Sequence, residues 1–257
     1  MNVIVNNLVT QYSLAGKGEL ILLLHGWGDT SQGLANLNTE LTKKYRVLAL
    51  DLPGFGGTQL PPDAWGLDDY AHFVHDFINK LGLNQPFAII GHSNGGAIAI
   101  RGCALQLFKP VKLVLMAASG IRNTRSMRRL LVTIVAKLGN VATVCLPSRY
   151  RQVLRAGLYG VVGSDLLVVE QLQETFKKTV RQDVQTDAAG LALPTLLIYA
   201  ENDQAVPLEY GQRYHQLIKS SQLKMIKQAG HFVHLDQPAQ VQHLIEDFLA
   251  DKTTRKH

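Results

Sequence analysis

Short, continuous apolar runs recur along the chain, separated by turn residues and by segments with a different periodicity. Runs of this kind are typical of strands that are buried on both faces of a sheet. A looser alternation near the N-terminus, over residues 3–14, predicts one or two edge strands. Buried strands are predicted over residues 20–24, 47–50, 87–90, 111–116, 195–200 and 223–226.

Between these runs, apolar residues recur at the spacing of one helix face. The clearest case follows Asp68 and places Tyr70, Val74, Phe77 and Leu81 on one face. Helices are also predicted over residues 31–43, from residue 94 onward, and over 208–218 and 238–249. This alternation favours an α/β fold with a mainly parallel, twisted sheet and helices on both faces. In such sheets the ligand site lies beyond the carboxyl ends of the strands.

One of these strand ends carries a motif with its own chemistry. Residues Gly91-His92-Ser93-Asn94-Gly95 fit G-x-S-x-G between a predicted strand and a predicted helix. A serine in so tight a turn takes a strained backbone conformation, so the residues two before and two after it need to be almost free of side chain. The turn lifts the Ser93 hydroxyl above the sheet edge. It also places the Asn94 amide at a helix N-terminus, where developing negative charge is stabilised.

Three other strand ends carry polar residues. The run 20–24 opens into His25-Gly26-Trp27-Gly28, the run 195–200 into a loop with Asp203, and the run 223–226 into a loop with His231. A serine hydroxyl is a poor nucleophile at neutral pH and needs a base within hydrogen-bond reach, with a carboxylate to orient that base. The three groups follow in the order Ser93, Asp203, His231, which is the order of α/β-hydrolases.

The sequence resembles α/β-hydrolase fold enzymes over essentially its whole length. The resemblance rests on the segments HGWGD, DLPGFGGT, GHSNGG, ENDQAVP and AGHFVHLDQP, in this order. It implies that Ser93 is the nucleophile, His231 the base and Asp203 the group that orients the base. It also implies that the backbone N–H groups of Trp27 and Asn94 form the oxyanion hole. The residues expected to border the substrate are Gly26, His92 and Val206.

Other histidines compete for the role of base. His25 and His92 flank the site, but each lies within a tight turn and is expected to make local hydrogen bonds. His234 is only three residues from His231 and is its rival. The glycine before His231 matches the G-H pair of the family, which favours His231.

The acid also has alternatives. Asp51 lies in the DLPG turn and is interpreted as binding backbone amides of that turn. The other family location for the acid, directly after residues 111–116, holds Ala117-Ala118-Ser119-Gly120. Asp203 is therefore the expected acid, with Glu201 as the neighbouring alternative.

The same motifs exclude some relatives and some chemistry. Haloalkane dehalogenases and epoxide hydrolases of this fold need a carboxylate at position 93, where this chain has serine. The HGWGD segment also differs from the HGGPG of proline iminopeptidases. The sequence has no cluster with the spacing of zinc ligands and no G-x-G-x-x-G dinucleotide motif, so no metal and no cofactor are expected.

The composition, with 46% hydrophobic and 18% charged residues, is that of an ordinary globular protein. The N-terminus shows no basic region followed by a long apolar run, so we expect no signal peptide and a cytoplasmic location. Cys103 and Cys145 do not make a disulfide framework, and each is interpreted as a small buried side chain.

The net charge of +6 is concentrated in residues 121–190, which hold eleven Lys and Arg against five Asp and Glu. We therefore divide the chain into a first core part (1–120), a helical cap (121–190) and a second core part (191–257). Apolar residues at helical spacing over 127–138 predict a cap helix with solvated bases. The alternative is a mobile basic lid that attracts anionic or lipid-like substrates. The sequence predicts neither a stable membrane span nor nucleic-acid binding.

The sequence thus predicts a monomeric or weakly dimeric serine hydrolase that cleaves carboxylic esters or lactones of small to medium size. One alternative is a serine-dependent carbon–carbon bond hydrolase that acts on a diketone. The other alternative is a receptor that uses the same pocket to bind a small molecule without rapid turnover.

Overall fold

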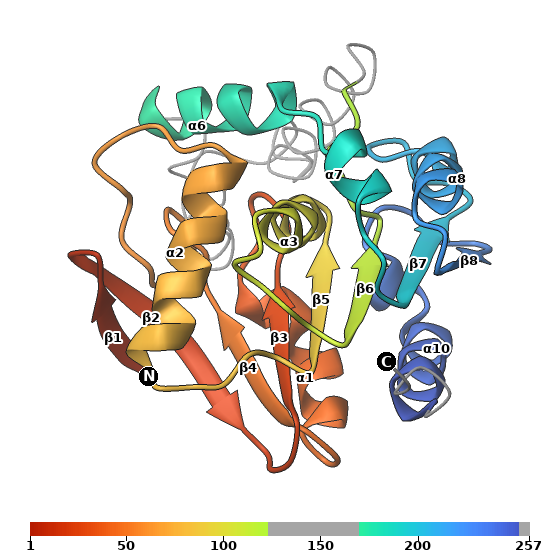
Figure 1. Ribbon diagram of the computed structural model, residues 1–257, viewed down its shortest axis with the longest axis horizontal. Helices are drawn as coiled ribbons and strands as arrows, with labels where there is room; N and C mark the ends of the chain where they lie inside the picture. The colour runs from red at the N-terminus through yellow and green to blue at the C-terminus, as the bar shows by residue number, and fades with distance from the viewer. Residues whose placement is uncertain (123–169, 252–257) are drawn as a thin grey trace, which may run out of the picture.

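The computed structural model describes residues 1–122 and 170–251. Within them, an eight-stranded sheet has the order β1-β2-β4-β3-β5-β6-β7-β8 (Figure 1). β1 pairs with β2 and β2 with β4 in antiparallel fashion, and all later neighbours are parallel. The mainly parallel sheet is therefore confirmed. The strands are β1 (Asn2–Val5), β2 (Leu8–Ala15), β3 (Leu20–Leu24), β4 (Arg46–Leu50), β5 (Ala88–His92), β6 (Lys112–Met116), β7 (Thr195–Ala200) and β8 (Ser221–Ile226).

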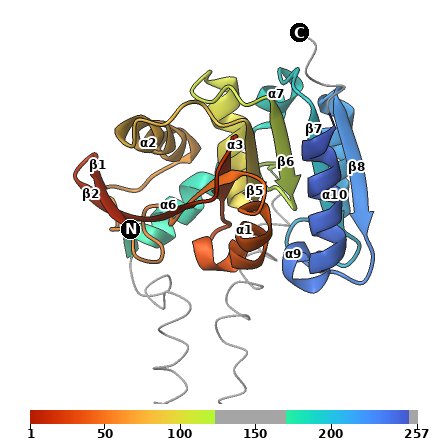
Figure 2. The same ribbon diagram turned by 90° about the horizontal axis from the view of Figure 1, so that it is seen from below.

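Helices cover both faces of the sheet, as Figure 2 shows in the view from below. One face packs against α2, α3, α7 and α8, and the other packs against α1 and α10. None of the described helices is long and apolar enough to cross a membrane. The helices are η1 (Ser31–Leu34), α1 (Ala35–Leu41), α2 (Leu67–Lys80), α3 (Asn94–Ala104), α6 (Glu170–Arg181), α7 (Gln185–Ala189), α8 (Leu208–Leu217), α9 (Val233–Asp236) and α10 (Pro238–Ala250).

The apolar runs explain this layering. All five residues of β3 are buried, and successive side chains point to opposite faces of a strand. Leu22 and Leu24 therefore join the core beneath α2 and α3, whereas Ile21 and Leu23 join the core beneath α1 and α10. A strand that alternated apolar and polar residues would leave one of these helical layers without a core.

Several details differ from the elements predicted by periodicity. The first predicted helix opens with a turn of 3-10 helix, η1, before it continues as α1, and the Thr30 side chain caps η1. Strand β8 begins two residues earlier than predicted, at Ser221. The short helix α9 was not predicted, because four residues are too few to show a period. The helix expected over 127–138 and Cys145 lie outside the described residues, whereas Cys103 is buried as expected.

The segment 170–191 returns from the predicted cap to the core and is tied to α2 and α3. The Arg101 guanidinium binds Asp68 at 2.8 and 3.0 Å and Asp187 at 3.1 Å, so it joins α3, α2 and α7. This guanidinium holds the pKa of Asp68 below its usual range. Figure 1 shows α6 lying across the carboxyl ends of the central strands. A helical cap over residues 121–190 stays a prediction, since most of that segment lies outside the described residues.

The C-terminal helix is held to the sheet by a buried cation. The Lys112 side chain is inaccessible to solvent and donates to the carbonyl oxygens of Phe248 (2.6 Å), Leu249 (3.1 Å) and Asp251 (2.6 Å). The last carbonyls of a helix have no partner within the helix, and a positive charge there also interacts favourably with the helix dipole. Lys112 thus satisfies the end of α10.

We expect Lys112→Met to lower the free energy of unfolding by about 2–3 kcal/mol, because three carbonyls would lose their donor in a buried place. The measurement is urea unfolding followed by circular dichroism. Lys109→Met is the matched control, since Lys109 lies on the exposed turn just before β6. Equal midpoints for the two variants would contradict this role of Lys112.

Candidate active site

Ser93 occupies a sharp turn between β5 and α3. Its backbone has φ 51° and ψ −116°, in the left-handed half of conformational space that side chains disfavour. A side chain at Gly91 would come within 2.6 Å of the Gly95 carbonyl oxygen, and one at Gly95 would collide with the Leu24 carbonyl. Both glycines of the predicted motif are therefore required by close backbone contacts, and the predicted turn is confirmed.

The hydroxyl of Ser93 meets an imidazole that comes from the loop after β8. Ser93 Oγ lies 3.0 Å from His231 Nε2, and the two residues are 138 positions apart in the chain. Ser93 is 3% exposed, and only 10% of the His231 side chain is exposed. The pair is therefore shielded from bulk water, which favours proton transfer between the two atoms over exchange with solvent.

The other nitrogen of the imidazole is fixed by Asp203, in the loop after β7. His231 Nδ1 lies 2.8 Å from Asp203 Oδ2, and the aspartate side chain is inaccessible to solvent. The second oxygen, Oδ1, accepts from the backbone N–H groups of Ala205 and Val206, both at 2.8 Å. A carboxylate only accepts, so the imidazole proton lies on Nδ1 and Nε2 is left to accept the serine proton. The sheet thus brings the three predicted residues into one hydrogen-bonded line.

The alternative acids lie elsewhere. Asp51 accepts from the backbone N–H of Ser31 at 2.8 Å and from that of Gly57 at 3.0 Å, which is the local turn bonding that was predicted. Glu201 is exposed at the surface, whereas Asp203 is 6% exposed. Asp203 is therefore the carboxylate that faces the imidazole of His231.

His25 is buried within the turn after β3. Its Nδ1 donates to the Gly26 carbonyl at 2.8 Å, and its Nε2 accepts from the Leu52 N–H at 2.8 Å. Burial lowers the pKa of His25, although the nearby carboxylate of Asp29 opposes this effect. The ring is therefore a neutral part of the turn, and the predicted local bonding is confirmed.

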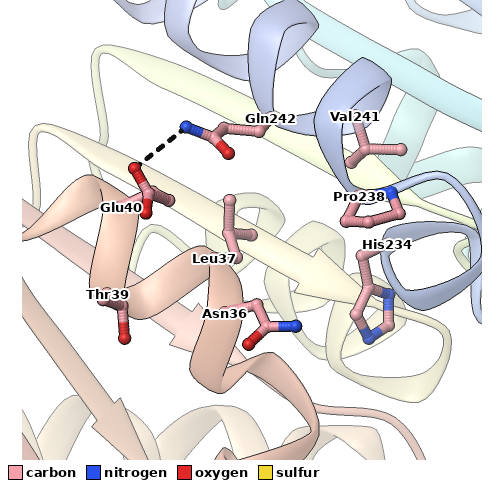
Figure 3. Close-up of a pocket in the computed structure, with 8 residues that line it drawn as sticks. All are labelled: Asn36, Leu37, Thr39, Glu40, His234, Pro238, Val241 and Gln242. Carbon is pink, nitrogen blue, oxygen red and sulfur yellow. Dashed lines mark hydrogen bonds between the residues drawn. The ribbon is translucent and has the colours of Figure 1, made fainter.

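His234 lies on the far side of the His231 loop. Its ring is 4% exposed and lines a cavity of 230 Å³ between α1 and α10. In Figure 3 the His234 imidazole and the Asn36 amide lie on facing sides of this cavity, and Gln242 and Glu40 are joined at its other end. We call it the rear cavity. His234 therefore faces the rear cavity, whereas His231 contacts Ser93.

The turn after β3 closes over the nucleophile. A Cβ at Gly26 would lie 3.0 Å from the Ser93 Cβ, so the peptide before Trp27 passes directly beside the serine. The Trp27 ring is held edge-to-face between Phe55 (centroids 5.0 Å apart) and Phe176 (5.2 Å). Among the described residues, the backbone N–H of Trp27 has no hydrogen-bond acceptor.

The family follows from a comparison with protein-family models. The model of the "Alpha/beta hydrolase family" matches residues 21–243, which is most of the chain. This chain belongs to the alpha/beta hydrolase family. The match begins within β3, extends beyond β8 and includes all three residues of the hydrogen-bonded line.

Relatives of this alpha/beta hydrolase differ in their named reactions. The 2-hydroxy-6-oxo-2,4-heptadienoate hydrolase of Pseudomonas putida is 26% identical, over 96% of this chain and 95% of its own. A serine hydrolase involved in carbazole degradation is 26% identical, with a TM-score of 0.77 over 97% of this chain and 98% of its own. The enol-lactonase of Burkholderia xenovorans is 19% identical, with a TM-score of 0.80 over 98% and 100%.

Sequence reasoning missed two aromatic contacts of this alpha/beta hydrolase. Phe176 of α6 packs on Trp27, and Phe232 packs edge-to-face on His231 with centroids 5.4 Å apart. Phe232 directly follows the predicted base in the sequence, so this position could have indicated the contact. Phe176 lies in a segment that was interpreted by its charge, and nothing local in the sequence marks it as a contact of Trp27.

Two residues expected to border the substrate lie inside the protein. His92 is 1% exposed, and its Nε2 lies 2.9 Å from the carbonyl oxygen of His231. Val206 is also 1% exposed, and its backbone N–H holds Asp203. Contact of Gly26, His92 or Val206 with a substrate stays a prediction.

Proposed function

We propose that this protein is a serine hydrolase that cleaves carboxylic esters or lactones through an acyl-serine intermediate. The observation that carries the proposal is the line from Ser93 through His231 to Asp203, with contacts of 3.0 and 2.8 Å. These are the contacts by which a base activates a hydroxyl and a carboxylate orients the base.

In the first half of the reaction, Ser93 Oγ attacks the ester carbonyl carbon and gives its proton to His231 Nε2. The imidazolium that forms is stabilised by the buried Asp203 carboxylate, because its Nδ1–H already points at Oδ2. His231 then gives the proton to the alkoxide leaving group, and the acyl group remains on Ser93. In the second half, water repeats both proton transfers and releases the acid.

The negative charge of the tetrahedral intermediate needs donors, for which we propose the backbone N–H groups of Trp27 and Asn94. Asn94 is the first residue of α3, so its N–H has no acceptor within the helix and lies at the positive end of the helix dipole. The close approach of Gly26 to Ser93 supports the second donor. Removal of one such donor typically costs about 10²–10³ in rate.

A neutral substrate suits the described surroundings of Ser93. Apolar side chains of Phe55, Leu172 and Phe176 gather around Trp27 and the adjoining loop. Among the described residues, one Lys or Arg is buried. It is Lys112, whose ammonium group is bound to the end of α10. A substrate carboxylate would need a cation or dedicated donors when it is desolvated, whereas an ester with an apolar acyl group does not.

The relatives favour a second candidate, which is hydrolysis of a carbon–carbon bond. The Pseudomonas putida relative is named for a 2-hydroxy-6-oxo-dienoate, and a second relative for 2-hydroxymuconate semialdehyde. Both substrates carry a ketone or aldehyde conjugated through a diene, and the same serine, base and donors would serve their cleavage. The two candidates therefore share the line of Ser93, His231 and Asp203 and differ in the bond that is cleaved.

A substrate panel separates the candidates. We would measure kcat/KM for p-nitrophenyl acetate, butyrate and octanoate, for a series of lactones, and for a vinylogous 1,5-diketone. Turnover of the esters or lactones above that of the diketone supports the proposal. The reverse ranking selects the carbon–carbon hydrolase, and ligand binding with negligible turnover of every compound selects a receptor.

His231, and not His234, is proposed as the base. We expect His231→Ala to lower kcat by at least about 10³-fold, since members of a triad act as a unit. His234→Ala removes a ring that faces the rear cavity and should lower kcat by less than about tenfold, through packing alone. The measurement is ester turnover by purified variants with matching circular dichroism. The opposite ranking would contradict the assignment of the base.

A further inference from the structure

The His92 ring is a buried polar group that the reaction steps above do not use. It is the last residue of β5 and directly precedes Ser93. Its Nε2 lies 2.9 Å from the carbonyl oxygen of His231. A carbonyl only accepts, so Nε2 carries the proton and donates it to the backbone of the loop that holds the base.

The same ring touches loops from three strand ends. A Cβ on Gly26, in the turn after β3, would lie 2.9 Å from His92 Nδ1. The rings of His231 and Phe232, in the loop after β8, have centroids 4.9 and 5.3 Å from that of His92. His92 itself is the last residue of β5. The ring thus lies where the proposed oxyanion loop, the nucleophile turn and the base loop meet.

His234 closes this arrangement from behind. Its ring stands edge-on to His92, with centroids 4.8 Å apart, and its other side lines the rear cavity (Figure 3). His92 and His234 are therefore in packing contact.

We propose that His92 is a positioning residue, which sets the place of His231 by donating a hydrogen bond to its backbone carbonyl. The inference rests on the proposed role of His231 as base. The imidazole of His231 is joined to its backbone by two rotatable bonds, and Asp203 holds the ring through Nδ1 alone. The hydrogen bond from His92 holds the backbone carbonyl of His231. Together the two contacts keep His231 Nε2 at 3.0 Å from Ser93 Oγ. A displacement of about 1 Å at such a contact can cost about 10²-fold in rate.

Two substitutions separate a donor from a space-filling ring. Glutamine places an N–H₂ group near the position of Nε2, so His92→Gln keeps the donor without the ring. Methionine has a comparable apolar volume and adapts to irregular cores, so His92→Met keeps packing without the donor. If positioning is the role, His92→Met should lose about 10–100-fold in kcat with little change in KM, and His92→Gln should recover most of that loss.

The matched control is His234→Met. This residue is also deeply buried, and its ring packs against the rings of His92 and Phe232. It should keep kcat within about threefold of the parent protein, because only packing changes. The thermal unfolding midpoint of every variant is measured as well, so that a loss of fold is not counted as a displacement of His231.

The readout is the second-order rate with which a fluorophosphonate probe labels Ser93, measured beside ester turnover. The probe needs only an activated serine, so it does not depend on the identity of the substrate. We expect slow labelling of His92→Met and nearly parental labelling of His92→Gln and His234→Met. Parental labelling of His92→Met, or equal losses in His92→Gln and His92→Met, would overturn the inference. If esters are not turned over while the probe still reacts, the ester proposal fails and the labelling series still decides the role of His92.

Discussion

Ser93→Ala is expected to lower ester turnover by at least about 10⁴-fold while the fold and its stability are preserved. The reason is local. The Ser93 hydroxyl makes the hydrogen bond to His231, whereas the strained turn around Ser93 is formed by backbone atoms. Ser93 N donates to the Met116 carbonyl at 2.9 Å, and Ser119 N donates to the Ser93 carbonyl at 3.1 Å. Alanine keeps both bonds.

Two measurements check this prediction. The first is kcat/KM on the best ester of the panel, together with thermal unfolding. The second is mass spectrometry after treatment with a fluorophosphonate, which should place the label on Ser93 in the parent protein and nowhere in Ser93→Ala. Ser119→Ala is the matched control, since its backbone touches that of Ser93 and its hydroxyl makes no described contact with His231. A label on any other serine would remove Ser93 from the role of nucleophile.

Periodicity alone was sufficient to predict the framework. Each apolar run became a strand, because a strand between two helical layers must be apolar on both faces. The run 20–24 is the clearest example, since all of its residues are buried in the centre of the sheet. The least regular strand, β8, has exposed positions at the sheet edge, and its start was placed two residues too late for that reason.

The line of Ser93, Asp203 and His231 was also predictable, because each residue lies in the turn or loop that follows a strand. Parallel strands bring their carboxyl ends to one edge of the sheet, so ordered motifs at strand ends predict neighbours in space. Glycines at fixed offsets from Ser93 added a second, independent signal. The structure shows their reason, since any side chain at Gly91 or Gly95 would overlap backbone atoms.

The remaining contacts could not be predicted, because they join positions that share no local pattern. Phe176 reaches Trp27 from a helix that lies far along the chain, and Arg101 joins Asp68 to Asp187 across three helices. Such pairs depend on how helices pack after the sheet has formed. His92 illustrates the same point at the site. Its position in the sequence shows that it neighbours the nucleophile, but its hydrogen bond to the His231 carbonyl could not be predicted.

Asp203→Asn is the second substitution with a large expected effect, and its mechanism is a change of tautomer. Oδ1 accepts from the N–H groups of Ala205 and Val206, so an asparagine would keep its oxygen there and turn its N–H₂ group toward His231. The imidazole would then accept at Nδ1 and carry its proton on Nε2, which points at Ser93 Oγ. A protonated Nε2 cannot take the serine proton, so kcat should fall about 10⁴-fold with KM nearly unchanged.

Asp236→Asn and Asp51→Asn test whether this loss belongs to Asp203. Asp236 is the last residue of α9, which follows the loop with His231, and its carboxylate accepts from the Gly230 N–H at 2.8 Å. Its replacement should leave kcat within about threefold of the parent, as for a surface position. Asp51→Asn should act on stability, because Asp51 binds the backbone of Ser31 and Gly57. If folded Asp51→Asn lost as much kcat as Asp203→Asn, the orienting carboxylate would have to be sought away from the loop after β7.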